Sequence, residues 1–509
     1  GSFSASGLRI GGPFTVEVTA PGFETAQVTD VFLTAGQPFR LPVELNATEI
    51  ITVTASSVSG AGSKSQGPIT TLGRNEIEGV ASVNRDIRDM ARRDPFVSID
   101  ASNARTIEIA GQNGRLNRFS VDGIQFSDDF GINNGGLPTS RGPVPFDAIE
   151  QMSVKIAPYD VSEGDFQGGA VNVVLRSGTN RFTGSAFYTY SNDSLTGDRI
   201  RGNPVNLDFT SKQYGGFLSG PIVKDKLFFA IAYEKLKESD PVDEGPAGMG
   251  FATEIPRLSQ TAVDRVSAIA QSVYGYDTLG VFQGASETDE KMTAKLDWNV
   301  TDDHRVSLTY IRNEGNQQFS QNMNTSNTGP TFGYRSNGYE LTEEVNSGTF
   351  QLNSQWSDAF STEFRAAYRD YNRGQTPFGD TSFGQIGVCL DETSITAGTG
   401  NDRTSCGNTS TSQPIVYFGP DVSRHANQLN TENLSIDLTA RLEAGAHSFK
   451  FLVGYTDVDV FNLFLQRANG EYYFDSITDF EAGIANRVRL AGAVPSGDVD
   501  DAAARFSTQ

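Results

Sequence analysis

The chain has 509 residues and carries 62 acidic against 40 basic side chains, which gives a formal net charge of −22 at pH 7. A surface this acidic repels nucleic acid and excludes it as a partner. No segment reaches the run of roughly 20 apolar residues that a membrane-spanning helix needs, so a helical membrane protein is excluded too. A β-barrel is not excluded, because only every second residue of its strands faces lipid.

Residues 1–47 predict the end of a small β-sandwich. Alternating strands are expected over 14–19, 26–28 and 41–45, with a Pro21-Gly22 turn between the first two. The stretch GPFTVEVTAPGFETAQVTDVFLTAGQPFRLPVEL resembles the carboxypeptidase regulatory-like module, a transthyretin-like sandwich, with its early strands missing. That module is not catalytic, so the resemblance implies no enzymatic activity.

Residues 48–68 combine a β-branched strand with a linker rich in serine and glycine. The strand consists of Glu49, Ile50, Ile51, Thr52, Val53, Thr54 and Ala55. An extended segment with a flexible flank can pair through its backbone with a sheet edge of another protein. The strand resembles the TonB box, by which a TonB-like periplasmic energy transducer grips an outer-membrane receptor. The alternative is that it is the last strand of the sandwich or plain linker.

Residues 69–178 have an α+β pattern. A short helix is expected over 84–91, starting near Ser82 and stopping at Asp94-Pro95. Strands are expected over 106–111 and 117–124, the second ending in an Asp-Gly turn. A further pair of strands is expected over 149–154 and 168–174.

Two motifs in this region resemble the plug domain of TonB-dependent outer-membrane receptors. The first, IEIAGQNGRLNRFSVDGI, contains the plug residues Val121, Asp122 and Gly123, and the second contains Gly168 and Gly169 ahead of the final plug strand. Ala110 and Ala157-Pro158 depart from the family pattern and indicate a divergent branch. The resemblance implies a ligand-facing loop with Ser127, Asp128, Asp129, Asn133, Asn134 and Arg141. The alternative is a plug apex that meets no ligand.

Residues 179–509 predict the N-terminal part of a transmembrane antiparallel β-barrel. About nine spanning strands are expected from the alternation of apolar and polar residues. Short turns are expected at 220–225, 301–303, 357–359 and 443–447, and long polar segments at 239–287, 316–345 and 374–428. Short turns on one side and long loops on the other are typical of outer-membrane barrels. One long loop predicts a helix over 258–274, with Val263, Val266, Ile269 and Ala270 on its apolar face.

The GPIVKDKLFF motif at 220–229, together with the N-terminal module, resembles the Oar-like branch of TonB-dependent receptors. The resemblance implies a 22-stranded barrel that encloses the plug. Since an open sheet is not viable in lipid, we expect this chain to be a fragment of roughly half a receptor, or its remaining strands to lie elsewhere.

Cys389 and Cys406 lie in one polar loop and predict a local disulfide formed in an oxidising compartment. Two free thiols are the alternative. Loop carboxylates at Asp391, Glu392, Asp402, Asp457 and Asp459 could hold calcium, although exposed acidic loops are usually only solvated. The histidines at 304, 425 and 447 are far apart, and no catalytic or cofactor motif occurs, so we expect no catalytic residues, no resident metal and no cofactor.

The prediction is therefore a mainly β protein of the Gram-negative outer membrane, in contact with lipid, that acts as a TonB-dependent transporter. Its large loops suit a peptide, protein or glycan ligand, and an iron chelate is the alternative ligand. The alternative is a surface barrel with a structural or protein-binding role, in adhesion or secretion, that binds a surface partner protein without active uptake.

Overall fold

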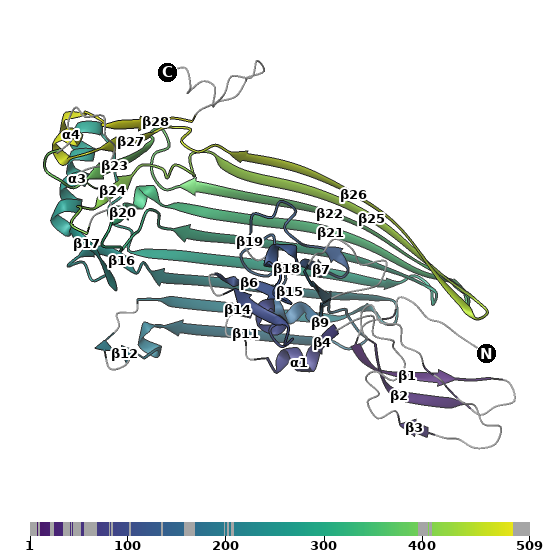
Figure 1. Cartoon of the computed structure of the whole chain (residues 1–509). Coiled ribbons are helices and arrows are strands. Elements are labelled where there is room, and N and C mark those ends of the chain that lie inside the picture. The colour runs from purple at the N-terminus through teal and green to yellow at the C-terminus, as the bar shows by residue number, and fades with distance from the viewer. Residues whose placement is uncertain are drawn as a thin grey trace, which may run out of the picture.

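The computed structural model of the protein describes residues 8, 11–20, 25–33, 41, 43, 52–54, 69–80, 82, 85–100, 103–133, 136–156, 168–197, 199–200, 203–204, 208–394, 406 and 410–491. Three parts can be followed in Figure 1: a long curved sheet, a small α+β domain against that sheet, and a folded region where the long connections meet. We call them the wall, the plug and the cap.

The wall is a nine-stranded antiparallel sheet in which every strand pairs with its neighbour along the chain, as the alternation predicts. Its strands are β11 (Thr183–Asn192), β14 (Thr210–Val223), β15 (Leu227–Pro241), β18 (Gly284–Asn299), β19 (His304–Phe319), β21 (Tyr339–Ser357), β22 (Phe360–Pro377), β25 (Asn427–Ala444) and β26 (His447–Phe464). The sheet does not close on itself, because β11 and β26 pair with no further strand among the described residues.

One face of the wall is apolar because strand register aligns apolar residues from strand to strand. Phe229, Leu296, Leu308, Phe350, Ala366, Ile436 and Tyr455 are consecutive register partners across seven strands. Leu308 keeps 47% of its surface exposed although it lies in mid-strand. Along each strand, the residues that alternate with the apolar ones point to the other face. Glu234 and Asp289 are examples, and both are buried there. A sheet with exposed apolar and buried polar residues is typical of a barrel wall in lipid.

Two boundaries in the wall differ from the prediction. The first turn was placed at 220–225, but β14 continues through Val223 and the turn consists of Lys224, Asp225 and Lys226. The strands also run further into the segments predicted as long loops, for example to Phe319 in β19 and to Pro377 in β22. Register pairing with a long neighbour keeps these polar strand ends in the sheet.

The plug is built on a five-stranded sheet of order β4-β9-β10-β7-β8. Its elements are β4 (Ile69–Gly73), α1 (Arg74–Glu78), α2 (Ile87–Ala91), β5 (Val97–Asp100), β6 (Asn103–Ile109), η1 (Gly114–Leu116), β7 (Arg118–Val121), β8 (Ile124–Gln125), η2 (Phe146–Ala148), β9 (Ile149–Lys155) and β10 (Ala170–Leu175). The four predicted strands occur as β6, β7, β9 and β10, and β9 pairs with β10, whereas β6 pairs with β5 rather than with β7. The helix α1 was not predicted. The other helix begins at Ile87 rather than near Ser82, because the Asp86 side chain accepts from the Arg88 backbone N–H and caps it.

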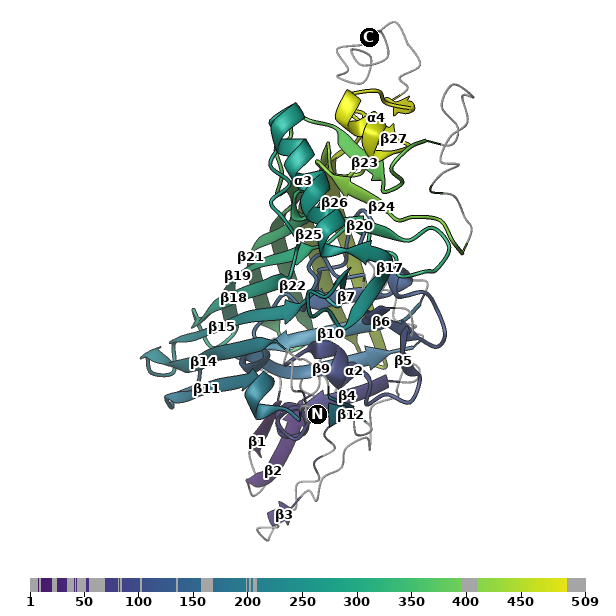
Figure 2. The same ribbon diagram turned by 90° about the vertical axis from the view of Figure 1, so that its left-hand side faces the viewer.

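The plug packs against the polar face of the wall, which curves around it (Figure 2). One apolar core is shared between the two. Plug residues such as Phe119 and Met152 belong to the same buried cluster as Phe217, Ile311 and Val345 of the wall. The apolar face of the wall therefore points away from the plug.

A three-stranded sheet of β1 (Gly11–Val18), β2 (Ala26–Leu33) and β3 (Thr52–Thr54) lies near the short-turn end of the wall (Figure 1). The strand predicted over 41–45 is not seen where the chain is described, because Leu41 and Val43 are outside any strand; residues 42, 44 and 45 lie outside the described residues. Instead, β3 pairs in parallel with β2 at Gln27–Thr29.

The cap lies at the opposite end, where the long connections meet (Figures 1 and 2). It comprises β16 (Glu244–Ala247), β17 (Thr253–Ser259), α3 (Gln260–Tyr274), β20 (Thr331–Gly333), η4 (Arg335–Asn337), β23 (Gln385–Cys389), β24 (Ile415–Phe418), β27 (Glu471–Phe474), α4 (Ile477–Ala482) and β28 (Arg487–Arg489). The first connection carries η3 (Asp193–Leu195), β12 (Arg199–Ile200) and β13 (Asn203–Pro204).

The cap has its own apolar core, built from four separate connections. The predicted helix occurs as α3 and buries the four residues expected of it. Ser259 caps its start and Gly275, with φ 68°, ends it in the left-handed conformation. Strands β20, β24, β23, β27 and β28 form one sheet beside α3, so the long connections constitute a folded unit.

Candidate functional site at the plug and wall interface

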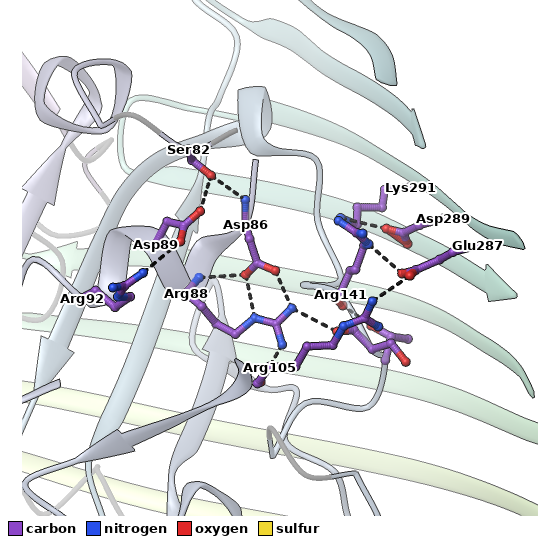
Figure 3. Close-up of polar contacts among 12 residues, drawn as sticks. Ser82, Asp86, Arg88, Asp89, Arg92, Arg105, Arg141, Glu287, Asp289 and Lys291 are labelled. Carbon is purple, nitrogen blue, oxygen red and sulfur yellow. Dashed lines mark hydrogen bonds and ion pairs between the residues drawn. The ribbon is translucent and has the colours of Figure 1, made fainter. Parts of the chain in front are cut away.

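The interface between plug and wall carries a network of buried ion pairs. Arg88 is at its centre on the plug side (Figure 3). Its side chain pairs with Asp86 and donates to the backbone carbonyls of Ser140 and Arg105. It therefore joins α2 to β6 and to the loop between β8 and η2. Burial by itself raises the pKa of Asp86, but the adjacent Arg88 guanidinium outweighs it and lowers that pKa to about 2.

Arg141 lies between two glutamates of the wall. The Arg141 Nε is 2.8 Å from an oxygen of Glu287, and one of its Nη atoms is 3.1 Å from Glu238. These glutamates are direct register partners on β15 and β18, a placement of like charges that destabilises a sheet. The plug arginine thus neutralises a repulsive pair in the wall. Burial disfavours its charge, yet Glu287, Asp289 and Glu238 raise the pKa of Arg141 above its ordinary value.

Glu287 also forms an ion pair with a second plug segment. Arg105 of β6 is 2.7 Å from its other carboxylate oxygen. Next to it, Glu343 of β21 accepts from both the backbone N–H (2.7 Å) and the hydroxyl (2.8 Å) of Ser140. A small pocket lies here between Thr139–Arg141 and the wall, lined on the wall side by residues such as Glu287 and Glu343. The same short plug segment is therefore held by three wall strands.

A second cluster lies nearer the short-turn end, around Arg85. Its guanidinium is 2.8 Å from Asp147 and 3.2 Å from Glu234 of β15. Its guanidinium carbon also lies 3.7 Å from the ring centroid of Phe187 on β11. Gln213 of β14 donates to the other oxygen of Glu234 at 3.0 Å. Arg85 therefore contacts two strands of the wall, β11 and β15, and β14 joins the cluster through the bond from Gln213 to Glu234.

The predicted ligand-facing residues are engaged in contacts with the plug or the wall. Asp129 pairs with Arg369 of β22, and Asn133 donates to the Tyr371 hydroxyl at 3.1 Å. Ser127 accepts from the backbone of Phe119 (2.9 Å), and Asp128 accepts from the backbone N–H groups of Phe130 (3.1 Å) and Asn133 (2.6 Å). Arg141 pairs with the wall as described above, and Asn134 lies outside the described residues.

The predicted plug motif forms a turn and a close packing contact. Asp122 and Gly123, with φ 48° and 82°, make the turn between β7 and β8, and Val121 ends β7 in the plug core. Asp122 also accepts from Lys295 of β18 at 2.9 Å. Gly168 and Gly169 are buried, and a Cβ at Gly169 would overlap the Ile109 side chain. Glycine is required there because β6 and the start of β10 approach so closely.

The remaining predicted site residues lie away from this interface. Of the coupling segment Glu49–Ala55, only Thr52, Val53 and Thr54 are described, and they form the edge strand β3. Cys389 and Cys406 form a disulfide in the cap, with Cα atoms 5.7 Å apart. Asp391 lies beside the two sulfur atoms, but sulfurs joined in a disulfide are not thiolate ligands for a metal.

The acidic residues considered for calcium do not gather at one place among the described residues. Glu392 pairs with Arg265 in the cap, while Asp457 and Asp459 lie on β26 opposite Leu434 and Glu432. Asp402 lies outside the described residues.

Sequence patterns did not single out Arg85, Arg88, Arg105, Glu238 or Glu287. A usable signal existed for the glutamates: in β15 and β18 they alternate with the apolar residues, so they point to the opposite face. The arginines carry no such signal, because Arg85 lies outside any element and Arg88 and Arg105 lie in short elements of the plug whose pattern does not show which side chains meet a partner.

None of the helices in the described part of the chain has both the length and the apolar character needed to cross a membrane.

Comparison with known families gives one match over most of the chain. The family described as "Outer membrane beta barrel domain" matches residues 174–245 and 240–499. The TonB-dependent transporter Oar of Myxococcus xanthus is 24% identical over 271 residues, which is 50% of this chain and 24% of that protein. The chain therefore spans about a quarter of that relative.

Among solved structures, the outer membrane transporter YddB from Escherichia coli is similar in fold, with a TM-score of 0.54 and 12% sequence identity. The similarity covers 81% of this chain and 50% of YddB, so the chain spans about half of its length. The siderophore receptor PirA from Acinetobacter baumannii has a TM-score of 0.46 at 17% identity, over 77% of this chain and 48% of PirA.

Proposed function

Because this chain belongs to the outer membrane β-barrel family and so lies in the outer membrane of a Gram-negative bacterium, we propose that it is the plug-bearing part of a TonB-dependent transporter. The observation that carries the proposal is the plug itself. An α+β domain packs on the polar face of a wall whose other face is apolar. A domain inside the lumen blocks passage through it, so its rearrangement would control transport.

The ion pairs support the proposal that the plug both blocks the lumen and can be displaced within it. Arg141 and Arg85 contact the wall through charged groups, and such contacts can be exchanged for water or for a passing ligand more easily than apolar packing can. Ligand would enter through the cap and reach the loop Ser127–Arg141, whose described polar groups now bind the wall or the plug itself. The long connections of the cap would suit a peptide, protein or glycan ligand.

Energy would come from a TonB-like periplasmic transducer that pairs with residues 49–55. Their described part is β3, an edge strand held by three register pairs to β2. An edge strand can leave its sheet at low cost and add to another one. Strand β3 lies toward the short-turn end of the wall, where a periplasmic partner would reach it (Figure 1).

A surface receptor without active uptake is the second candidate. The observation that favours it is the cap, a folded unit with its own core and a disulfide, which is well suited to holding a partner protein. The two candidates differ in whether residues 49–55 bind a transducer.

The test uses outer-membrane vesicles that carry the protein and the purified periplasmic domain of the host's TonB-like transducer. Deletion of Glu49–Ala55 should reduce transducer binding to background, because the pairing strand is gone. Deletion of residues 56–62, seven residues of the adjacent linker, should leave binding within about twofold. Equal binding by both deletions and the wild type would reject energy coupling through this segment and favour the second candidate.

A further inference from the structure

His425 lies where the cap joins the wall. It belongs to the connection between β24 and β25 and faces the connection between β26 and β27. Four contacts hold these two connections together. Leu465 N donates to Ala426 O at 3.0 Å, Arg467 N to Val422 O at 2.9 Å, Gln466 Nε2 to Ser423 Oγ at 3.0 Å, and Asn469 N to His425 Nδ1 at 3.1 Å. The last contact is the only one of the four that involves a titratable side chain.

The two ring nitrogens of His425 have opposite roles. Nδ1 lies against a backbone N–H, that of Asn469, so it must accept. Nε2 lies 2.9 Å from the carbonyl oxygen of Pro420, so it must donate. Both contacts exist only when the ring is neutral and its hydrogen is on Nε2. Protonation places a second hydrogen on Nδ1, which then points at the N–H of Asn469.

Asn469 and the residue after it are also hydrogen-bonded to other parts of the cap. Its side chain donates to Thr381 O at 2.7 Å, and the carbonyl of the next residue, Gly470, accepts from the Gln385 backbone N–H at 3.0 Å. Gln385 begins β23, and β27 begins immediately after Gly470. The contact at His425 therefore ties the start of β27, and with it α4 and β28, to the end of the wall.

The surroundings of His425 favour the neutral ring. Burial lowers its pKa, and the positive charge of Arg467 on the facing connection acts in the same direction. The Pro420 carbonyl and Asp421 on its own connection oppose them without reversing the direction. Arg467 is itself paired with Glu471 of β27. A further charged group nearby, Arg424, stacks on the Tyr339 ring. The shift places protonation below the ordinary histidine value of about 6.5.

We propose that His425 is an acid-sensitive clasp between the cap and the wall, which opens when the ring is protonated and frees the connection that carries β27, α4 and β28. The clasp goes beyond the proposed transport function, since it acts on the cap whichever ligand or partner the protein has. Its consequence is a cap that is fastened to β25 and β26 at neutral pH and loosened there in acid.

The test is amide hydrogen exchange at residues 465–470, measured on the protein in outer-membrane vesicles at pH 7.5 and pH 5.0. After correction for the intrinsic pH dependence of exchange, the wild type should show protection about tenfold lower at pH 5.0, the effect of losing one hydrogen bond and gaining a partly buried charge. Exchange of α3, elsewhere in the cap, should not change with pH.

Two variants separate the clasp from a merely structural role. His425→Asn keeps an oxygen close to the position of Nδ1 that accepts from Asn469 at any pH, so its protection should be high at both pH values. His425→Phe removes the acceptor, so protection should be low at both. His447→Asn, at the short-turn end of the wall, should behave as wild type. The proposal is wrong if His425→Asn keeps the pH dependence of the wild type, or if the wild type shows none.

Discussion

At the scale of single residues, the interface depends on charges whose placement follows from backbone geometry. The pleat of β15 and β18 brings Glu238 and Glu287 directly opposite each other, and only a cation from the plug makes that arrangement stable. In the plug, Asp86 caps α2 and pairs with Arg88 at the same time. Each charge is buried with a partner, so loss of one partner leaves the other uncompensated.

We predict that Asp86→Asn lowers the free energy of plug unfolding by about 2–3 kcal/mol, because a pKa near 2 against an ordinary 3.8 reflects that much stabilisation. The lowered pKa also sets the sign of the pH dependence. The contribution is complete above about pH 4 and is lost as pH falls through about 2. Urea titrations at several pH values, with hydrogen exchange in α2 as the readout, measure both effects.

Glu78→Gln is the matched control for this variant. Glu78 pairs with Arg74 at 2.7 Å, but more than half of its side chain is exposed, so solvent screens the pair. Its loss should change stability by no more than about 0.5 kcal/mol. Equal effects of the two substitutions would contradict the special role of the buried pair.

At the scale of elements, the strands and α3 were predictable because their signals are local. Period-two alternation identifies the wall strands, and the spacing of Val263, Val266 and Ile269 identifies the helix. The cap sheet was not predictable. Its strands β20, β23, β24, β27 and β28 are three to five residues long and come from three connections far apart in the sequence, so no local pattern links them.

The disulfide is a covalent cross-link within this cap. Cys389 ends β23, and Cys406, 17 residues later, precedes β24. Replacing both with serine should lower cap stability by about 3 kcal/mol, because the open loop gains entropy in the unfolded chain. Thermal unfolding followed by protease sensitivity of residues 465–491 measures the loss. Wild-type protein treated with reductant should unfold at the same temperature as the double variant; a difference would point to the serines themselves.

At the scale of the whole molecule, membrane insertion depends on where the apolar rows of the wall end. Leu308 and Phe350 belong to an apolar row, whereas two rows toward the cap the register partners Arg312, Asn346, Asp370, Glu432 and Asp459 are polar or charged. The change from apolar to charged rows on one face marks the boundary between hydrocarbon and water.

Phe350→Arg should therefore destabilise the membrane-inserted protein by about 2–4 kcal/mol, since it places a charge in the apolar row. Asn346→Arg changes the same face of the same strand, β21, but in the charged row, and should cost about 0–1 kcal/mol. Guanidinium-induced unfolding in lipid vesicles compares the two. Similar costs would mean that the apolar rows do not face lipid.

The sequence by itself determined the strand alternation, the Asp122-Gly123 turn and the apolar face of α3, because each depends on neighbours within a few residues. Only the tertiary structure decided that Arg141 lies between Glu238 and Glu287, that Arg85 contacts two wall strands and that four connections share one cap core. The ion pairs of Arg85 and Arg141 with the wall join residues more than 90 positions apart, and they and the cap core form only after register and curvature have brought the plug, the wall and the long connections together.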